Sequence, residues 1–244
     1  MPDAIFDDPR LARVYDPLDP DRSDLDVYDA IAVEVGARSV LDVGCGTGTF
    51  ACMLAMRGVA VVAVDPAQAS LDVAASKPAS ERVLWLCGDA TTLPALQVDA
   101  AFMTANVAQV FLTDGEWSAT LLGVHGALKP GGTLVFEVRD PARRAWESWT
   151  PTSTFVSVDV PGLGVVESWE EVIDVRGELV TFRSMTNFVD EDLLLESTST
   201  LRFRPRTDVE TSLVANGFEL LDVRDATDRP GREFVFLAHR PTDS

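Results

Sequence analysis

Short apolar runs alternate with stretches of helical spacing over the first 140 residues of the chain. The strand-like runs are SVLDV (39–43), AVVAVD (60–65), RVLWLC (82–87), DAAFMT (99–104) and GTLVFEV (132–138). Helices are predicted near 24–35, 48–57, 67–76 and 115–128. Apolar strands that alternate with helices are typical of a doubly wound, mostly parallel sheet, so the pattern predicts an α/β fold.

The pattern changes after Arg139. From about 151 to 204 the helical period disappears, and four β-rich runs follow: TFVSVDV, VVESWEEVIDV, LVTFRSMTNFV and LESTSTLRFR. Turn-like PGLG, RGE and DED segments join them, which predicts an antiparallel meander. A helix at 207–216 and strands at 218–223 and 233–239 then return to the main sheet. The meander is therefore expected to be an insertion in one α/β domain.

Four parts follow from this division: an N-terminal arm and helix (1–36), a core (37–150), the β insertion (151–204) and a C-terminal part of the core sheet (205–244). The first 23 residues, rich in Asp and Pro, are predicted to form an extended or partly ordered arm. Two apolar strand faces in the insertion are expected to pack on the domain or on a second subunit: Val165, Trp169 and Ile173, and Val180, Phe182 and Phe188.

Two local patterns add detail. Capping-box spacing predicts helix starts at Thr113 and Thr207, each followed three residues later by Glu. The segment 138–149, which follows the fifth strand, is predicted to be an amphipathic helix whose Trp146 and Trp149 pack on the insertion.

The stretch VLDVGCGTGTF (40–50) places three glycines at alternate positions after the first strand. Such a loop lets a ligand approach the backbone and the amides of the following helix. The dinucleotide fingerprint would need its third glycine at position 49, where Thr49 stands, and a phosphate-binding Walker loop would need a lysine. Both phosphate-binding interpretations fail on spacing.

Acidic residues end three of the strands. Asp42, just before the loop, would repel a pyrophosphate but suits an ammonium or sulfonium group. Asp65 ends the second strand, where an acid accepts hydrogen bonds from ribose hydroxyls. Asp89 follows the third strand and is placed to take the exocyclic amine of an adenine. An amino-acid end, a ribose and an adenine together describe S-adenosylmethionine.

The chain resembles the class I S-adenosylmethionine-dependent methyltransferases. Four segments carry the resemblance: residues 40–50 (first motif), 61–67 (ribose-binding acid), 88–94 (adenine motif) and 128–138 (turn and fifth strand). It covers about 36–140 by motif and 205–240 by topology. The resemblance implies a Rossmann-like sheet of seven strands with the last antiparallel.

The resemblance also implies site residues. The implied donor-binding set is Tyr15, Tyr28, Asp42, Gly44, Gly46, Asp65, Pro66, Asp89, Ala90, Asn106 and Val107, the tyrosines being candidates for one that related enzymes fold over the donor. Many small-molecule members carry a histidine just after the fourth strand, but TANVAQVF here has none. An amine nucleophile, or a base supplied by Asp or Glu, is therefore expected. The acceptor-side candidates are Arg139, Asp140 and Gln109.

Charge and composition narrow the partners. The 39 acidic residues against 20 basic ones give a net charge of −19, which disfavours nucleic acid and anionic membranes. Arg202, Arg204 and Arg206 alternate and are interpreted as one solvated strand face. Three cysteines without CxxC pairing and two distant histidines predict no metal site. An acidic N-terminus and the lack of a long apolar stretch predict a cytoplasmic protein.

The sequence therefore predicts methyl transfer from S-adenosylmethionine to the N or O of a small-molecule acceptor, with S-adenosylhomocysteine as product. The β insertion is expected to cover the acceptor site and to offer a surface for a homodimer. Two alternatives stay open: a non-catalytic S-adenosylmethionine-binding or regulatory homologue, and an NAD-dependent oxidoreductase.

Overall fold

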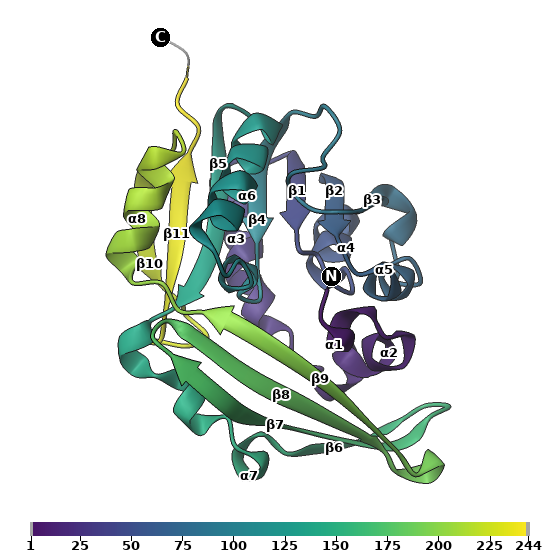
Figure 1. Ribbon diagram of the computed structural model, residues 1–244. Coiled ribbons are helices and arrows are strands. Elements are labelled where there is room, and N and C mark those ends of the chain that lie inside the picture. Colours follow the sequence, from purple (N-terminus) through teal and green to yellow (C-terminus); the bar gives the residue numbers. More distant parts are fainter. Residues whose placement is uncertain (1, 243–244) are drawn as a thin grey trace.

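The computed structural model describes residues 2–242, and its main element is a seven-stranded sheet of order β10-β11-β5-β4-β1-β2-β3 (Figure 1). The strands are β1 Ser39–Val43, β2 Ala60–Asp65, β3 Val83–Cys87, β4 Val98–Met103, β5 Leu128–Arg139, β10 Glu219–Asp225 and β11 Glu233–His239. Strands β1 to β5 pair in parallel, whereas β11 pairs antiparallel with both β5 and β10. The predicted Rossmann-like sheet with an antiparallel last strand is confirmed.

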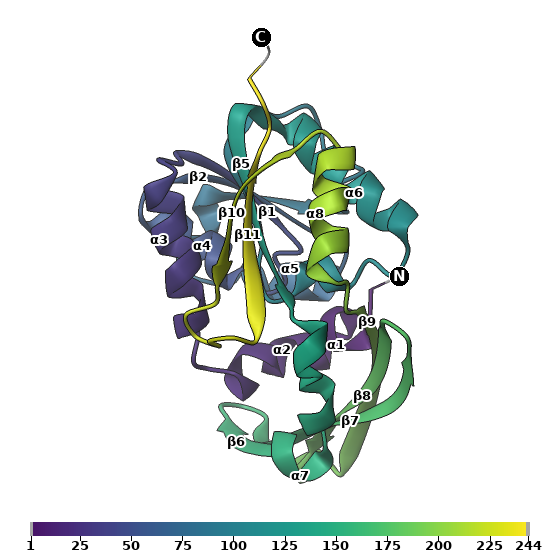
Figure 2. The ribbon, with the colours of Figure 1, turned by 90° about the vertical axis from the view of Figure 1, so that its left-hand side faces the viewer.

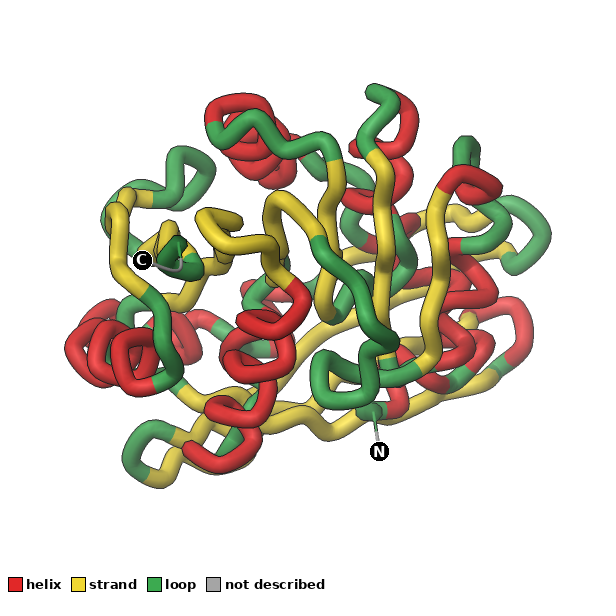
Figure 3. The backbone as a smooth tube through the Cα atoms, turned by 90° about the horizontal axis from the view of Figure 1, so that it is seen from above, coloured by secondary structure: helices red, strands yellow, loops and turns green. Residues whose placement is uncertain are grey.

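Helices cover both faces of this sheet (Figures 2 and 3). They are α3 Asp26–Glu34, α4 Thr49–Met56, α5 Gln68–Ala74, α6 Asp114–Ala127 and α8 Arg206–Ala215. Helices α3 and α4 bury Ile31 and Leu54 in one apolar cluster, and α6 and α8 bury Leu121 and Leu213 in another. The sheet is therefore doubly wound. Among residues 2–242, no helix has the length and apolarity needed to cross a bilayer.

A second, antiparallel sheet of order β6-β7-β8-β9 lies across the edge where β4 and β5 end (Figure 1). Its strands are β6 Val156–Val160, β7 Gly164–Arg176, β8 Leu179–Phe188 and β9 Leu193–Arg202. Short helical turns complete the chain: η1 Ser23–Leu25, η2 Ser80–Arg82, η3 Val107–Gln109, η4 Pro141–Arg143, η5 Ala145–Ser148, α7 Pro151–Thr154 and η6 Val189–Glu191. The predicted four-stranded meander is confirmed.

The inner face of strand β7 differs from the prediction. Val180 and Phe188 of β8 are fully buried, as expected, and Phe188 pairs with Val166 of β7. Residues of β7 with the same orientation as Val166 therefore face inward, which leaves Trp169 on the outer face. Ile173 falls at a bulge and is 48% exposed. The apolar alternation identified the outer face because the middle of the inner face, Ser168 and Glu170, is polar and lines a cavity.

The N-terminal arm is helical, so the prediction of an extended segment is wrong. It forms α1 Ala4–Asp7 and α2 Pro9–Leu18, which lie between the core and the four-stranded sheet (Figures 1 and 2). The carboxylate of Asp8 accepts hydrogen bonds from the amides of Arg10 and Leu11 and so caps α2. Asp followed by Pro marks a helix start here.

The segment after β5 is also different from the prediction. Instead of one amphipathic helix it forms the two turns η4 and η5, separated by Arg144 in the left-handed region (φ 47°). The tryptophans nevertheless pack on the second sheet as expected. Trp146 lies 4.6 Å from Phe203, and Trp149 lies 5.0 Å from Phe182, between ring centroids.

Only one of the two predicted capping boxes exists. Thr113 accepts from the amide of Glu116 (3.1 Å), whose carboxylate accepts from the amide of Thr113 (2.9 Å). Helix α8 instead begins at Arg206 after Pro205, so Thr207 lies inside its first turn and caps nothing. The rigid Pro205 already sets the helix start.

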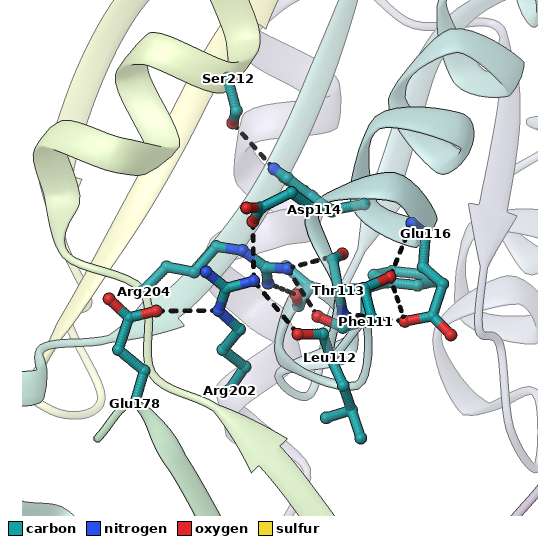
Figure 4. Close-up of polar contacts among 11 residues, drawn as sticks. Phe111, Leu112, Thr113, Asp114, Glu116, Glu178, Arg202, Arg204 and Ser212 are labelled. Carbon is teal, nitrogen blue, oxygen red and sulfur yellow. Dashed lines mark hydrogen bonds and ion pairs between the residues drawn. The ribbon is translucent and has the colours of Figure 1, made fainter. Parts of the chain in front are cut away.

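Two of the three alternating arginines, Arg202 and Arg204, donate hydrogen bonds to backbone carbonyl oxygens (Figure 4). The interpretation of all three as a solvated strand face is therefore wrong. Arg204 is 4% exposed and donates to the carbonyls of Phe111 (2.6 Å) and Thr113 (3.2 Å). Arg202 donates to the carbonyl of Leu112 and pairs with the carboxylates of Asp114 and Glu178. The end of β9 is thereby fixed to the segment that follows β4. Arg206 alone is half exposed, beside Glu210.

Candidate functional site

The glycine loop between β1 and α4 is shaped by close contacts. A Cβ on Gly44 would lie 2.6 Å from a methyl of Val107, so the loop packs directly on the segment after β4. A Cβ on Gly46 would meet nothing within 4 Å, and that residue has a left-handed φ of +52°. The loop is thus tight on one side and open on the other, as close approach of a ligand requires.

Asp65 holds this loop in place. Its carboxylate accepts from the amide of Gly46 (2.8 Å) and from the amide of Ala67 (2.8 Å). Each oxygen keeps a second acceptor position, so Asp65 remains able to bind two hydroxyl groups. The exposed Pro66 follows it, and burial raises the pKa of the Asp65 carboxyl.

Asp42 lies on β1 and is 1% exposed. Neither of its carboxylate oxygens has a hydrogen-bond partner among the described residues. Burial, and then the charge of Asp65, raise its pKa to about 7. Buried acceptors without partners are rare in folded proteins, and this pair fits a cationic ligand group.

The other predicted donor residues lie along the same edge of the sheet. Asp89 is exposed and lies two residues after Cys87, the residue of β3 that pairs with Asp65 of β2. Its carboxylate accepts a hydrogen bond from the amide of Thr91 (2.8 Å). Ala90 beside it is buried. Asn106 and Val107 follow β4, next to the glycine loop. The strand ends of β1 to β4 therefore bring these residues to one edge.

The arm lies over this edge. The carboxylate of Asp16 in α2 accepts from the hydroxyl of Thr47 (2.7 Å) and pairs with Lys77 (2.6 Å). The hydroxyl of Ser70 in α5 donates to the carbonyl of Phe6 (2.7 Å). Leu11 and Val14 of α2 pack on the second sheet. The arm therefore joins the glycine loop to the four-stranded sheet.

A cavity of about 300 Å³ lies where the arm, the core and the second sheet meet. Of the residues predicted for the site, Tyr15, Tyr28, Asn106 and Arg139 line it. Burial raises the pKa of both tyrosines. The walls of the cavity thus include helices α2 and α3, the segment after β4 and the end of β5.

Asp140 and Gln109 lie elsewhere. Asp140 caps the turn η4 by accepting from the amide of Ala142 (2.9 Å). Gln109 is fully buried, where its side chain accepts from the amide of Arg139 and donates to the carbonyl of Arg202. Both side chains support the backbone around the cavity and are not among the residues that line it.

The cavity contains more acidic than basic groups. Its carboxylates are those of Asp19, Asp24, Glu137, Glu170, Asp228 and Glu233. Its guanidinium groups are those of Arg22, Arg139 and Arg229.

The basic groups are already paired. Arg22 pairs with Asp24, and Arg229 with both Asp228 and Glu233. Arg139 lies 3.5 Å from Glu233 and 5.2 Å from the centroid of the Trp149 ring. Among the described residues, Asp19, Glu137 and Glu170 have no ion pair, so the cavity favours a cation.

Glu137 is the site residue that the sequence analysis missed. It is 2% exposed, and one carboxylate oxygen accepts from the amide of Asn106 (2.5 Å) while the other has no partner among the described residues. Burial raises its pKa to about 7, against the effects of the Asn106 amide and the Tyr28 hydroxyl. A single acid inside the apolar run GTLVFEV was the signal in the sequence.

The region that contains the glycine loop is similar in sequence to known methyltransferases. Residues 40–132 match a family described as a methyltransferase domain. The cypemycin N-terminal methyltransferase of a Streptomyces species is 38% identical over 106 residues, which are 43% of this chain and 43% of that protein. The matched segment makes up 43% of that protein and 24% of a second relative, the biotin biosynthesis bifunctional protein of Cellvibrio japonicus. The chain therefore spans less than half the length of each.

Solved structures share the whole fold. An S-adenosylmethionine-dependent methyltransferase of Clostridium acetobutylicum has a TM-score of 0.73 at 18% identity, covering 95% of this chain and 98% of that one. An amino pentose methyltransferase of Micromonospora echinaspora, solved with its methyl donor bound, has a TM-score of 0.67 at 21% identity, covering 91% of this chain and 93% of that one. At these identities the likeness establishes the fold alone.

Proposed function

We propose that this chain, whose core is a class I S-adenosylmethionine-dependent methyltransferase domain, transfers a methyl group from S-adenosylmethionine to a small-molecule acceptor. The observation that carries the proposal is the row of acids and glycines at the ends of β1 to β3. Asp42, Asp65 and Asp89 lie at or just beyond the ends of three neighbouring parallel strands, in the order in which an amino-acid end, a ribose and an adenine would be bound.

The residues present fit this donor. The two unpartnered oxygens of Asp42 suit its ammonium group, and the free acceptor positions of Asp65 suit its ribose hydroxyls. The open side of Gly46 leaves the backbone accessible. The donor supplies a methyl group on a positively charged sulfur and leaves as neutral S-adenosylhomocysteine.

The acceptor is held in the 300 Å³ cavity, which adjoins the donor edge through Asn106. The arm and the four-stranded sheet form walls of this cavity and so would align the two reactants, which by itself lowers the barrier of an in-line displacement. By name, the similar proteins include both an N-terminal methyltransferase and an O-methyltransferase, so the nature of the acceptor atom is inferred from the carboxylates of the cavity.

Calorimetry and turnover together test the proposal. We expect S-adenosylhomocysteine to bind and to raise the melting temperature, and NAD to do neither. With methyl-labelled S-adenosylmethionine, label should pass to at least one member of a panel of small amines and alcohols. Donor binding without transfer to any member would support the non-catalytic alternative, and NAD binding would support an oxidoreductase.

A further inference from the structure

We propose that Glu137 is a catalytic residue whose free carboxylate oxygen takes a proton from the ammonium form of an amine acceptor, while Glu170 holds that ammonium from the opposite wall. The inference rests on the methyl-transfer function proposed above and names its acceptor class and its base. Glu137 comes from β5 of the core and Glu170 from β7 of the four-stranded sheet, and both line the cavity.

The first observation is the unused oxygen of Glu137. Glu137 is 2% exposed, and the Asn106 amide binds one of its carboxylate oxygens; the Tyr28 hydroxyl lies close enough to lower the pKa of this carboxyl, but among residues 2–242 no donor makes a hydrogen bond of ordinary geometry to the second oxygen. The other fully buried carboxylate of the cavity, Glu233, differs, since it has both Arg139 and Arg229 within 4 Å. A buried acceptor left without a donor is destabilising, and such groups concentrate at functional sites.

The second observation is backbone strain beside this carboxylate. Ala105 and Asn106, directly after β4, both have left-handed φ angles, 57° and 64°. Two consecutive non-glycine residues in this region are unfavourable. The conformation brings the Asn106 amide onto one oxygen of Glu137 and so fixes the carboxylate. The strain is therefore used to orient Glu137.

The third observation is the position of Glu170. Its side chain lies half-buried on the inner face of β7, where among the described residues the carboxylate accepts one hydrogen bond, a long one from the hydroxyl of Ser184 (3.5 Å). Burial raises its pKa, and the charge of Arg139 opposes this rise. The charges of Glu137 and Glu170 both act on Arg139, so the two carboxylates lie near the same guanidinium.

The chemistry balances with these groups. An ammonium acceptor gives one proton to Glu137, and its nitrogen regains a lone pair. That pair forms the new N–C bond as the C–S bond breaks, and the bonding electrons stay on sulfur. The product leaves as an N-methylammonium ion, and Glu137 returns its proton to solvent. A hydroxyl fits less well, because a developing alkoxide would be repelled by the surplus carboxylates.

The environment of Glu137 suits this role near neutral pH. Besides burial, four groups act on it: the Asn106 amide, the Tyr28 hydroxyl of α3 and Arg139 of β5 lower its pKa, and Glu233 of β11 raises it. With a pKa of about 7, the carboxylate is largely ionised at pH 8 and protonated at pH 6.

The test compares the wild type with Glu137→Gln, Glu170→Gln and the control Glu171→Gln. Glu171 is the neighbour of Glu170 on the outer face and pairs with Arg183, so its replacement removes one charge outside the cavity. The probes are matched pairs: glucosamine and glucose, cyclohexylamine and cyclohexanol, and a glycine-initiated tripeptide and its N-acetyl form. Methyl transfer and S-adenosylhomocysteine affinity are measured from pH 5.5 to 9.

We expect amines to be methylated and their partners not, with kcat/KM rising through an apparent pKa near 7. Glu137→Gln should lower kcat by about 100-fold or more and abolish that rise, while donor affinity is kept. Glu170→Gln should raise KM about tenfold with little change in kcat. Glu171→Gln should match the wild type.

Two results would overturn the inference alone: wild-type kcat in Glu137→Gln, or methylation of alcohols in preference to their amines. Donor binding without transfer to any compound would refute both the inference and the proposed function. Failure of the wild type to bind S-adenosylhomocysteine at all would instead refute the proposed function. Equal melting-temperature increases on adding S-adenosylhomocysteine to all four proteins would exclude misfolding as the cause of lost activity.

Discussion

Among single residues, Asp65 has two roles. It lies at the edge of the sheet where the donor is proposed to bind, and its carboxylate also holds the glycine loop through the Gly46 amide. We therefore expect Asp65→Ala to weaken S-adenosylhomocysteine binding by about 100-fold, since two hydrogen bonds to a charged group are lost. Calorimetric titration measures this change. Asp72→Ala, an exposed acid on the adjoining helix α5, is the matched control. Unchanged affinity in Asp65→Ala would remove Asp65 from the site.

Asp42 gives a pH-dependent prediction for the protein without ligand. Its pKa is raised from 3.8 to about 7, so the folded state keeps a proton that the unfolded state releases. The contribution of Asp42 to stability is therefore complete below about pH 4 and is lost as the pH rises toward 7. Asp42→Asn should then raise the melting temperature relative to the wild type at pH 8 more than at pH 5. A difference independent of pH would contradict the shift.

The acids at strand ends were predictable from the sequence, because each follows an apolar run and parallel strands end at one edge. Glu137 was visible only as a single acid inside an apolar run, and its contact with the Asn106 amide, beside the left-handed residues Ala105 and Asn106, has no sequence pattern. Asp140 and Gln109 were chosen for their position in the sequence, and backbone hydrogen bonds occupy both side chains.

Among the secondary-structure elements, the arm is fixed over the glycine loop by Asp16. Asp16→Ala removes the bonds to Thr47 and Lys77, so we expect S-adenosylhomocysteine to dissociate several-fold faster, because the arm opens more readily. Stopped-flow displacement measures the rate. Asp3→Ala is the control, since the Asp3 side chain makes no capping hydrogen bond. Equal dissociation rates in the two variants would show that the arm does not retain the donor.

The junction between β9 and the segment after β4 depends on Arg204. Arg204→Ala leaves buried carbonyls without a donor and should lower the free energy of unfolding by about 2–4 kcal/mol. Arg206→Ala loses only an exposed i,i+4 pair and should change it by less than about 0.5 kcal/mol. Chemical denaturation compares the two variants. Similar losses would mean that Arg204 does not hold the sheets together.

Element types and order could be read from the sequence, since periodicity decides them. The arm could not, because its Asp and Pro residues suggested an extended chain, whereas Asp8 and Pro9 start a helix that Leu11 and Val14 pack against the second sheet. The inner face of β7 was also missed, because its polar side chains line a cavity.

The four-stranded sheet, at the scale of the whole molecule, supports both the cavity and the arm. Replacing 152–203 with a short Gly/Ser linker would remove Glu170 and also the apolar partners of α2, Val166 and Phe188. Methyl transfer should be lost, and donor binding should weaken as well. A homodimer through the outer face of this sheet, where Trp169 stacks on the exposed Phe155, stays a prediction.

The division of the chain into an arm, a core and an insertion followed from the change in periodicity. The cavity could not be predicted in this way, because residues more than 200 positions apart, such as Tyr15 and Glu233, line it together. No local pattern encodes such a contact, and the surplus of carboxylates becomes visible only when these segments meet.

Whether the cavity accepts an amine can be decided by transfer of label from methyl-labelled S-adenosylmethionine to the matched amines and alcohols, with each product identified by mass spectrometry. The account predicts an N-methylated amine, formed by the wild type and nearly absent with Glu137→Gln. Label on an alcohol in preference to its amine, or no label on any compound, would contradict it.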